Sequence, residues 1–156
     1  MTHDDLVKRA GKWLLGGARI PCSYSGGGFR KLSRAKVVFT EMVTAGSETP
    51  DAIGFYNSGG LSVLVECKVS RGDFRADAKK LFRHHPYMGM GDYRYFMTPP
   101  GLVKVEELPQ HWGLLECHPR SVAVSQLAER QEKAVRREVN VLWSAVRRLK
   151  EGESVD

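Results

Sequence analysis

Two acids and an amine in the middle of the chain, Asp51, Glu66 and Lys68, have types and spacing that suit chemistry. Glu66 and Lys68 follow the apolar run Leu61–Val65, which is typical of a short buried strand. Side chains alternate along a strand, so Glu66 and Lys68 should share one face while Cys67 lies on the other. Charged groups at the end of an apolar strand make a poor core, and this place is therefore a candidate site.

A hairpin would bring the first acid to the other two groups. Ala52–Tyr56 and Leu61–Val65 are both apolar, and the turn-forming residues Asn57–Gly60 separate them. If the two arms pair, Asp51 lies at the open end of the hairpin, beside Glu66. The spacing therefore predicts that pairing of the two arms brings Asp51 close to Glu66 and Lys68.

Two carboxylates beside an amine suit the hydrolysis of a phosphodiester. The reaction needs an activated water and positive charge near the phosphate, and carboxylates that hold Mg²⁺ or Mn²⁺ meet both needs. We expect Asp51 and Glu66 to be metal ligands, with the backbone carbonyl of Cys67 as a third. Lys68 would orient the water or stabilise the developing negative charge. Glu41, in the preceding predicted strand, is either a further ligand or a solvated acid.

The order Pro50-Asp51, fourteen residues, then Glu66-Cys67-Lys68 resembles the signature of the PD-(D/E)xK nuclease superfamily. The segments ECKVSRGDFRADAKK and GMGDYRYFMTPPGL are similar to small bacterial and phage proteins of this fold, including a group linked to DNA repair. The resemblance covers roughly residues 36–117. It implies a restriction-endonuclease-like core, metal binding at the two acids, a catalytic lysine and, as in many members, a homodimer.

The resemblance leaves one member of the site open. Many members carry an additional acid on the first helix, where Asp4 and Asp5 are the candidates, and Glu41 competes with them for that role. A Gln-x-x-x-Tyr pattern, which one subgroup carries in the helix after the motif, is absent from this sequence.

The charge of the chain favours a polyanionic partner. Lys and Arg number 24 against 18 Asp and Glu, for a formal net charge of +6. Charge favours nucleic acid first and a membrane surface second, and the resemblance implies that the nucleic acid is DNA. The candidate phosphate contacts are Arg30, Lys31, Arg71, Arg75, Lys79, Lys80 and Arg83; a solvated helix face is the alternative interpretation for those after residue 70.

Other features exclude several classes of protein. Three cysteines without paired spacing argue against a disulfide framework and a cysteine-based zinc site. No apolar run approaches membrane-spanning length. We therefore expect a cytoplasmic protein, and the resemblance implies that it belongs to a bacterium or a phage-infected host.

The hydrophobic pattern predicts an α/β or α+β fold with a central mixed sheet of about five strands, flanked by helices. Strands are expected over residues 37–43, 52–56, 61–68, 93–97 and 112–117, and helices over 3–15, 74–84 and 121–150. Residues 18–35, with a glycine triplet at 26–28, should be irregular. The long C-terminal helix should pack its apolar side on the core and solvate its basic side. One domain should span residues 1–150, with a disordered tail over 151–156.

These expectations combine into a metal-dependent DNA nuclease that acts in repair, recombination or phage DNA processing. The alternative is a catalytically inactive module of the same fold that binds DNA or a host protein.

Overall fold

The computed structural model describes residues 1–22, 28–44, 48–56 and 60–152. The predicted turn at 57–60, the glycine triplet at 26–28 and the predicted tail at 151–156 lie largely outside the described residues. The fold is α+β, as predicted: a mixed sheet of six strands in the order β3-β4-β5-β6-β7-β8, a smaller sheet of two, and helices around them.

The elements have the following bounds. The central sheet contains β3 (Val37–Thr40), β4 (Ala52–Phe55), β5 (Ser62–Cys67), β6 (Tyr93–Thr98), β7 (Gly113–Cys117) and β8 (Val122–Gln126), and the small sheet contains β1 (Arg19–Pro21) and β2 (Phe29–Lys31). The helices are α1 (His3–Gly17), α2 (Arg71–Ala78), α3 (Leu81–His84) and α4 (Val135–Glu151), with 3₁₀ turns at Pro86–Met88 and Val105–Glu107. Strands β5, β6 and β7 run parallel, and the remaining pairs in the central sheet are antiparallel.

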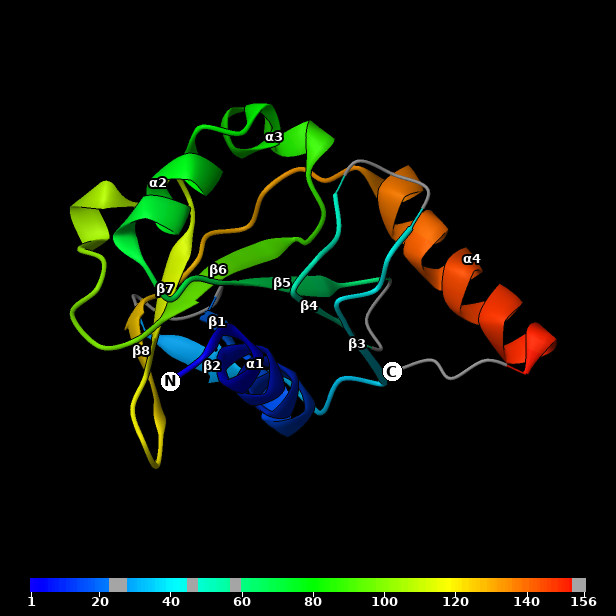
Figure 1. Cartoon of the computed structure of the whole chain (residues 1–156), viewed down its shortest axis with the longest axis horizontal. Helices are drawn as coiled ribbons and strands as arrows, with labels where there is room; N and C mark the ends of the chain where they lie inside the picture. Colours follow the sequence, from blue (N-terminus) through cyan, green and yellow to red (C-terminus); the bar gives the residue numbers. More distant parts are fainter. Residues whose placement is uncertain (23–27, 45–47, 57–59, 153–156) are drawn as a thin grey trace.

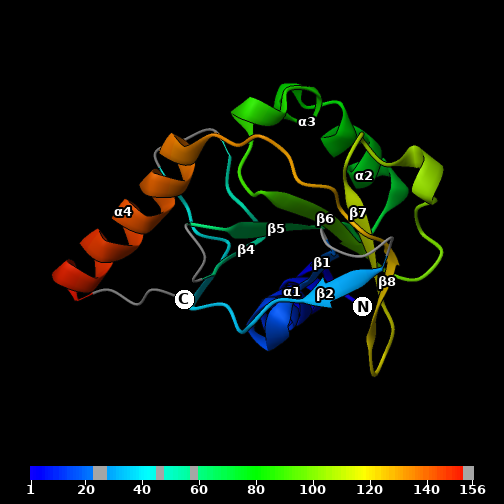
Figure 2. The same cartoon turned by 180° about the vertical axis from the view of Figure 1, so that it is seen from behind.

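Apolar side chains fill both faces of the central sheet. Helix α1 covers one face, where Leu6 packs in the same cluster as Val65 of β5. Helix α2 lies over the opposite face, where Phe74 joins Leu64, and α4 adds Val141 to that second cluster. Figure 1 shows α1 and the α2–α3 pair on opposite sides of the sheet, and Figure 2 shows the same layers from behind. The alternation of β5 therefore separates two core layers.

The start of α1 is set by its own sequence. The Thr2 hydroxyl accepts a hydrogen bond from the Asp5 backbone N–H at 3.2 Å, and the Asp5 carboxylate accepts one from the Thr2 N–H at 2.8 Å. This reciprocal capping box satisfies two backbone donors that a helix start otherwise leaves free. It places His3 and Asp4 in the first turn of the helix.

The prediction of one helix over residues 121–150 is wrong in its extent and in its orientation. Val122–Gln126 pairs with β7 as an edge strand, so the helix begins only at Val135. The two-residue alternation at the start of this segment fits a strand as well as part of a helical repeat, and pairing with β7 decides between them. The apolar side expected in the core faces outward: Trp143 is 68% exposed and Leu149 is 66% exposed.

The predicted helix over 74–84 is also wrong, because it is two shorter helices, α2 and α3. The break between them turns Leu81 outward, at 60% exposed, and turns Arg83 inward, at 4%. These are the opposite orientations from those of a continuous amphipathic helix.

Two smaller differences concern strands. The strand expected over 37–43 ends at Thr40, since Glu41 has a φ of 49°, in the left-handed region that no strand residue occupies. The segment 18–35, expected to be irregular, contains β1 and β2. Within the described part of the chain, no helix has both the length and the apolar character needed to cross a membrane.

Candidate active site at the end of β5

Asp51, Glu66 and Lys68 meet at one place, at the carboxyl end of β5. The Lys68 Nζ lies 3.4 Å from Glu66 Oε2 and 3.7 Å from Asp51 Oδ2. All three side chains are at least four-fifths buried. The two residues predicted to share a face of the strand do so, and Cys67 lies in the core cluster on the opposite, α1 side.

Strand pairing explains the convergence. Ala52 of β4 is paired with Val65 of β5, so the next position outward sets Asp51 opposite Glu66. The Asp51 carboxylate is held there because its Oδ2 accepts a 2.7 Å hydrogen bond from the Cys67 backbone N–H. The predicted hairpin therefore orients the first acid through the backbone of the second strand.

The surroundings of Glu66 shift its pKa. Burial raises the pKa of Glu66 to about 7; Arg83 opposes this rise and the charge of Asp51 adds to it. The Glu66 Oε1 atom is buried and has no hydrogen-bond partner among the described residues. A buried carboxylate oxygen without a partner is costly, and a cation or a donor at that oxygen would remove the cost.

Lys68 stays protonated in this setting. Its burial lowers its pKa, but the carboxylates around it, including Asp77 at 3.7 Å, outweigh that effect and raise the pKa above its ordinary value. A lysine held as ammonium cannot accept a proton from water. It can place positive charge where negative charge develops.

A buried ionic network supports the site from behind. Arg83 donates to Asp77 Oδ2 from Nε at 2.7 Å and to Glu48 Oε1 at 3.1 Å, and its guanidinium lies 3.3 Å from Glu66 Oε2. Only 1% of the Arg83 side chain is exposed. The prediction that Arg83 contacts DNA phosphates is wrong, because its donors are used inside the protein.

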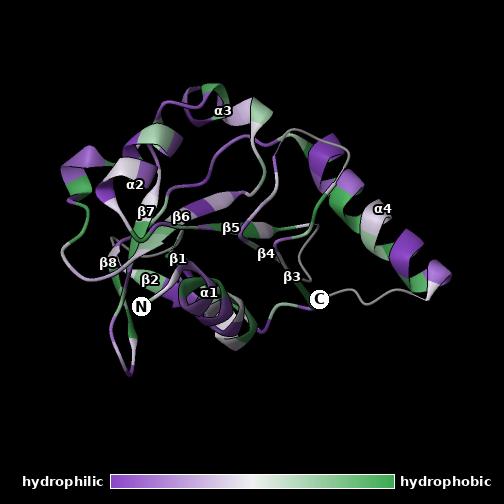
Figure 3. Cartoon of the chain, in the orientation of Figure 1, coloured by the Kyte–Doolittle hydropathy of each residue, from purple (hydrophilic) through white to green (hydrophobic). Residues whose placement is uncertain are grey.

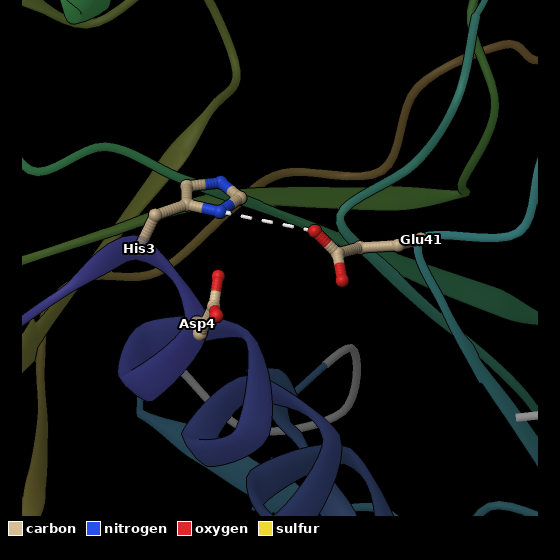
Figure 4. A group of neighbouring side chains, drawn as sticks. All are labelled: His3, Asp4 and Glu41. Carbon is tan, nitrogen blue, oxygen red and sulfur yellow. Dashed lines mark ion pairs between the residues drawn. The ribbon is translucent and has the colours of Figure 1, made fainter.

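Helix α1 brings a second group of ligand types to the same strand ends. His3 Nε2 lies 3.4 Å from Asp51 Oδ1, and His3 Nδ1 lies 3.9 Å from Glu41 Oε1. Ligand atoms of His3, Asp4 and Glu41 all lie within 4.8 Å of one another, and Figure 4 shows the three side chains around one small space. Asp51 thus stands between this group and the Glu66–Lys68 pair.

This arrangement bears on the acid that the resemblance left open. Asp5 is used in the helix cap, whereas Asp4 and Glu41 both face His3. Sequence reasoning missed His3. The capping box at Thr2 and Asp5 could have placed His3 in the first turn, but no local signal says which strand end that turn meets.

The donors present fit a hard divalent cation. Carboxylate oxygens of Asp51 and Glu66 are the ligands that Mg²⁺ and Mn²⁺ prefer, and the partnerless Glu66 Oε1 is available to one. His3 is within reach of Asp51 as an additional ligand or a hydrogen-bond partner. The Cys67 carbonyl stays a predicted ligand.

The other predicted phosphate contacts fall into two groups. Arg30, Arg75 and Lys79 are exposed and free to meet a ligand. Arg71 forms an ion pair with Glu107, and Lys80 is 2.7 Å from Asp77, so part of their charge is already compensated.

A basic pocket that sequence reasoning did not find lies against α1. It encloses about 390 Å³, and the residues that line it are Arg9, Lys12, Trp13, Gly16, Gly17, Arg19, Lys31, Arg120, Ser121 and Val122. No carboxylate lines it, and none of its five cations forms an ion pair within the described residues. Of the predicted DNA contacts, Lys31 alone belongs to it. The cations come from four separate segments, which is why no sequence pattern shows them.

Local geometry holds this pocket in shape. Arg9 donates to the backbone carbonyls of His118, Pro119 and Ser121. At the end of α1, Gly17 has a φ of 98°, and a Cβ there would lie 2.2 Å from the Leu32 carbonyl oxygen. Only glycine fits that close approach.

Comparison with known proteins identifies a structural relative. No family model and no curated protein matches the chain. The solved structure of the SPO1766 protein of unknown function from Silicibacter pomeroyi is similar, with a TM-score of 0.54 and 30% sequence identity. The match covers 76% of this chain and 84% of that chain. The chain therefore belongs to the same family as the SPO1766 protein.

Proposed function

We propose that this protein is a metal-dependent nuclease that hydrolyses phosphodiester bonds in DNA. The observation that carries the proposal is the meeting of Asp51, Glu66 and Lys68 at one strand end, with a buried Glu66 oxygen that lacks a partner. Carboxylates that share a site repel each other unless a cation lies between them. Lys68 supplies one such charge, and a divalent metal would supply the rest.

Each residue has a distinct role in the proposed reaction. Water attacks phosphorus and gives up a proton to the solvent, a new P–O bond forms, and the ester bond breaks as the leaving oxygen takes up a proton from the solvent. A divalent cation, when bound, would make water more acidic and polarise the phosphate. Asp51 and Glu66 would hold it, and the Lys68 ammonium would stabilise the charge that accumulates on the phosphoryl oxygens. Asp77 and Arg83 position these groups without reaching DNA.

The proposed contacts with DNA are between exposed cations of the protein and phosphates. The basic pocket offers uncompensated cations to a phosphate backbone. Arg30 on β2, and Arg75 and Lys79 at α2 across the sheet, are further exposed cations. Such contacts position DNA but do not read its sequence.

The test is cleavage of a panel of DNA structures (duplex, single strand, junction) with Mn²⁺. We expect cleavage of at least one substrate by the wild type and none by Lys68→Ala. Lys104→Ala removes an exposed lysine outside the site and serves as the matched control, which should cut normally. Equal cleavage by wild type and Lys68→Ala would remove Lys68 from the mechanism.

One observation favours the alternative, a nuclease-fold module that binds DNA without cutting it. Glu66 is already within ion-pair distance of both Lys68 and Arg83, so protein cations compensate much of its charge. Calorimetric titration with Mn²⁺ separates the two functions. Binding that Asp51→Asn abolishes supports the nuclease, and no binding by the wild type supports the module.

A further inference from the structure

The outward face of α4 is apolar along its whole length. Its exposed large apolar side chains are Val135, Val139, Leu142, Trp143, Val146 and Leu149, with exposed fractions from 37% to 68%. The side that packs on the protein is smaller and more polar: Glu138, Val141, Ser144 and Ala145. Figure 3 shows hydrophobic bands on α4 although the helix stands to the side of the sheet. We name the six exposed residues the α4 stripe.

The α4 stripe is as large as the biggest apolar patches that single proteins show, and patches of that size often serve a function. Apolar side chains of these types at these exposures leave on the order of 500 Å² in water. Patches of about 300–600 Å² are the largest that a monomeric protein usually shows. Two such stripes packed together would bury about 1,000 Å², the lower limit for a specific interface between proteins.

The spacing of the residues in the α4 stripe indicates which kind of surface would pack against it. Val135, Val139, Leu142, Val146 and Leu149 are separated by 4, 3, 4 and 3 residues. This is the repeat that a helix presents to another helix along a packed seam. A second helix with an apolar side is therefore the surface that would fit the α4 stripe.

The stripe is nearly symmetric about Leu142: Val135 and Leu149 lie seven residues before and after it, and Val139 and Val146 lie three and four residues away. In an antiparallel pair of two copies, Leu142 faces Leu142 of the other copy. Val135 then faces Leu149 at the same level of the seam, and Val139 meets Val146 with an offset of one residue, about 1.5 Å along the helix. A surface that is complementary to itself under a two-fold axis is what an isologous dimer requires.

The charges beside the stripe set the expected salt dependence. Arg136, Arg147 and Lys150 lie at its edge and are exposed. In a pair of identical helices these like charges would repel across the rim, and salt would screen that repulsion within about 10 Å at 0.1 M. An acidic partner helix would show the reverse, because salt would weaken its attraction to the same cations.

We propose that two copies of this chain associate through antiparallel packing of their α4 stripes. The proposal does not depend on the nuclease assignment, since no residue of the stripe belongs to the candidate active site.

The first test is the mass of the protein in solution as a function of concentration, by sedimentation velocity. We expect the wild type to reach twice the 17.5 kDa of one chain in the micromolar range, and to dimerise as tightly or more tightly when salt is raised. Leu142→Glu places two like charges at the symmetry centre and should weaken the dimer at least a hundredfold. Leu149→Glu, at a more exposed position, tests the seam with less risk to folding, and Arg147→Gln at the rim is the control that should still dimerise.

The second test fixes the direction of the helices. A mixture of Val135→Cys and Leu149→Cys proteins should form a mixed disulfide under mild oxidation, whereas a parallel pair would instead cross-link each variant to itself. A wild type that stays monomeric at 100 μM overturns the proposal, as would a dimer that Leu142→Glu and Leu149→Glu both leave intact. Weakening of the dimer by salt would also count against it.

Discussion

Folded proteins usually bury apolar side chains and expose charged ones, and two regions of this molecule do the opposite: the end of β5 buries charges, and the outer face of α4 exposes apolar side chains. At β5, Glu66, Asp77 and Arg83 are buried as charged groups, while on α4 Trp143 and Leu149 are left mostly in water. Charged residues are rarely buried unless paired, and large apolar patches are rarely left uncovered. Both departures cost stability in the isolated chain. Departures of this kind concentrate at functional surfaces, which is why both proposals begin from them.

The two regions differ in what would complete them. The β5 site gathers groups at short range, where each charge depends on a particular neighbour and a small cation can change the balance. The α4 stripe consists of apolar side chains and gains only from the area that it buries. The first region should therefore be sensitive to single substitutions and pH, and the second to concentration. The predictions that follow test this contrast.

The largest effect is expected at Asp51. Asp51→Asn keeps the shape of the side chain but removes a negative metal ligand, so Mn²⁺-dependent cleavage should fall at least about a thousandfold, or on the order of 4 kcal/mol in barrier height. Initial rates on the best DNA substrate measure the loss. Glu106→Gln, an exposed acid elsewhere, is the control and should keep its rate. A rate within tenfold of wild type at Asp51→Asn contradicts its role as a ligand.

The next largest effect is on stability, at Arg83. Arg83→Ala removes the buried guanidinium that pairs with Asp77 and Glu48, and should lower the free energy of unfolding by about 3 kcal/mol or more. Arg75→Ala, an exposed cation four residues before Lys79, should change it by about 0.5 kcal/mol or less. Urea unfolding measures both. Similar changes in the free energy of unfolding for the two variants would mean that the buried ion pairs of Arg83 do not stabilise the fold.

Metal binding should depend on pH through Glu66. Its folded pKa of about 7 lies above its ordinary 4.5, so the folded protein holds an extra proton between these values. In the absence of metal, stability should therefore fall as pH rises through this window. A cation needs the deprotonated form, so apparent Mn²⁺ affinity should fall about tenfold for each pH unit below 7.

Calorimetry at pH 5.5, 6.5 and 7.5 measures this dependence. In Glu66→Gln the affinity should be weaker and its slope with pH should flatten. Equal affinity of the wild type at pH 5.5 and 7.5 would separate Glu66 from metal binding.

A smaller effect is expected in the basic pocket. Lys12→Ala removes one uncompensated cation, so DNA affinity should fall about threefold at 0.1 M salt and the salt slope should decrease by about 1. Fluorescence anisotropy with a labelled oligonucleotide measures both. Lys104→Ala should leave the slope unchanged, and an unchanged slope for Lys12→Ala would place the DNA elsewhere.

The smallest effect is the stability of the single chain after a change in the α4 stripe. At concentrations low enough to avoid association, Trp143→Ser should change the free energy of unfolding by about 0.5 kcal/mol or less, since the ring is mostly in water. Val141→Ala, on the packed side of the same helix, should cost about 2 kcal/mol. If Trp143→Ser costs as much as Val141→Ala, the stripe is packed inside the folded chain and not free for a partner.

Local patterns in the sequence were sufficient for the central part of the site. Alternation along Leu61–Lys68 put Glu66 and Lys68 on one face, and the short hairpin put Asp51 opposite Glu66, as the strand register confirms. These relations involve neighbours or a tight turn, where the strand repeat of two residues leaves one arrangement. The α+β class followed from the same periodicity.

Contacts between distant segments decided the rest. Strand pairing with β7 ended the expected long helix, and the packing of α1 on the sheet brought His3 to Asp51. The break after α2 turned Arg83 into the protein, where three carboxylates receive it. A helical repeat shows that α4 has an apolar face but not what that face meets, because burial depends on which surfaces the whole fold brings near it.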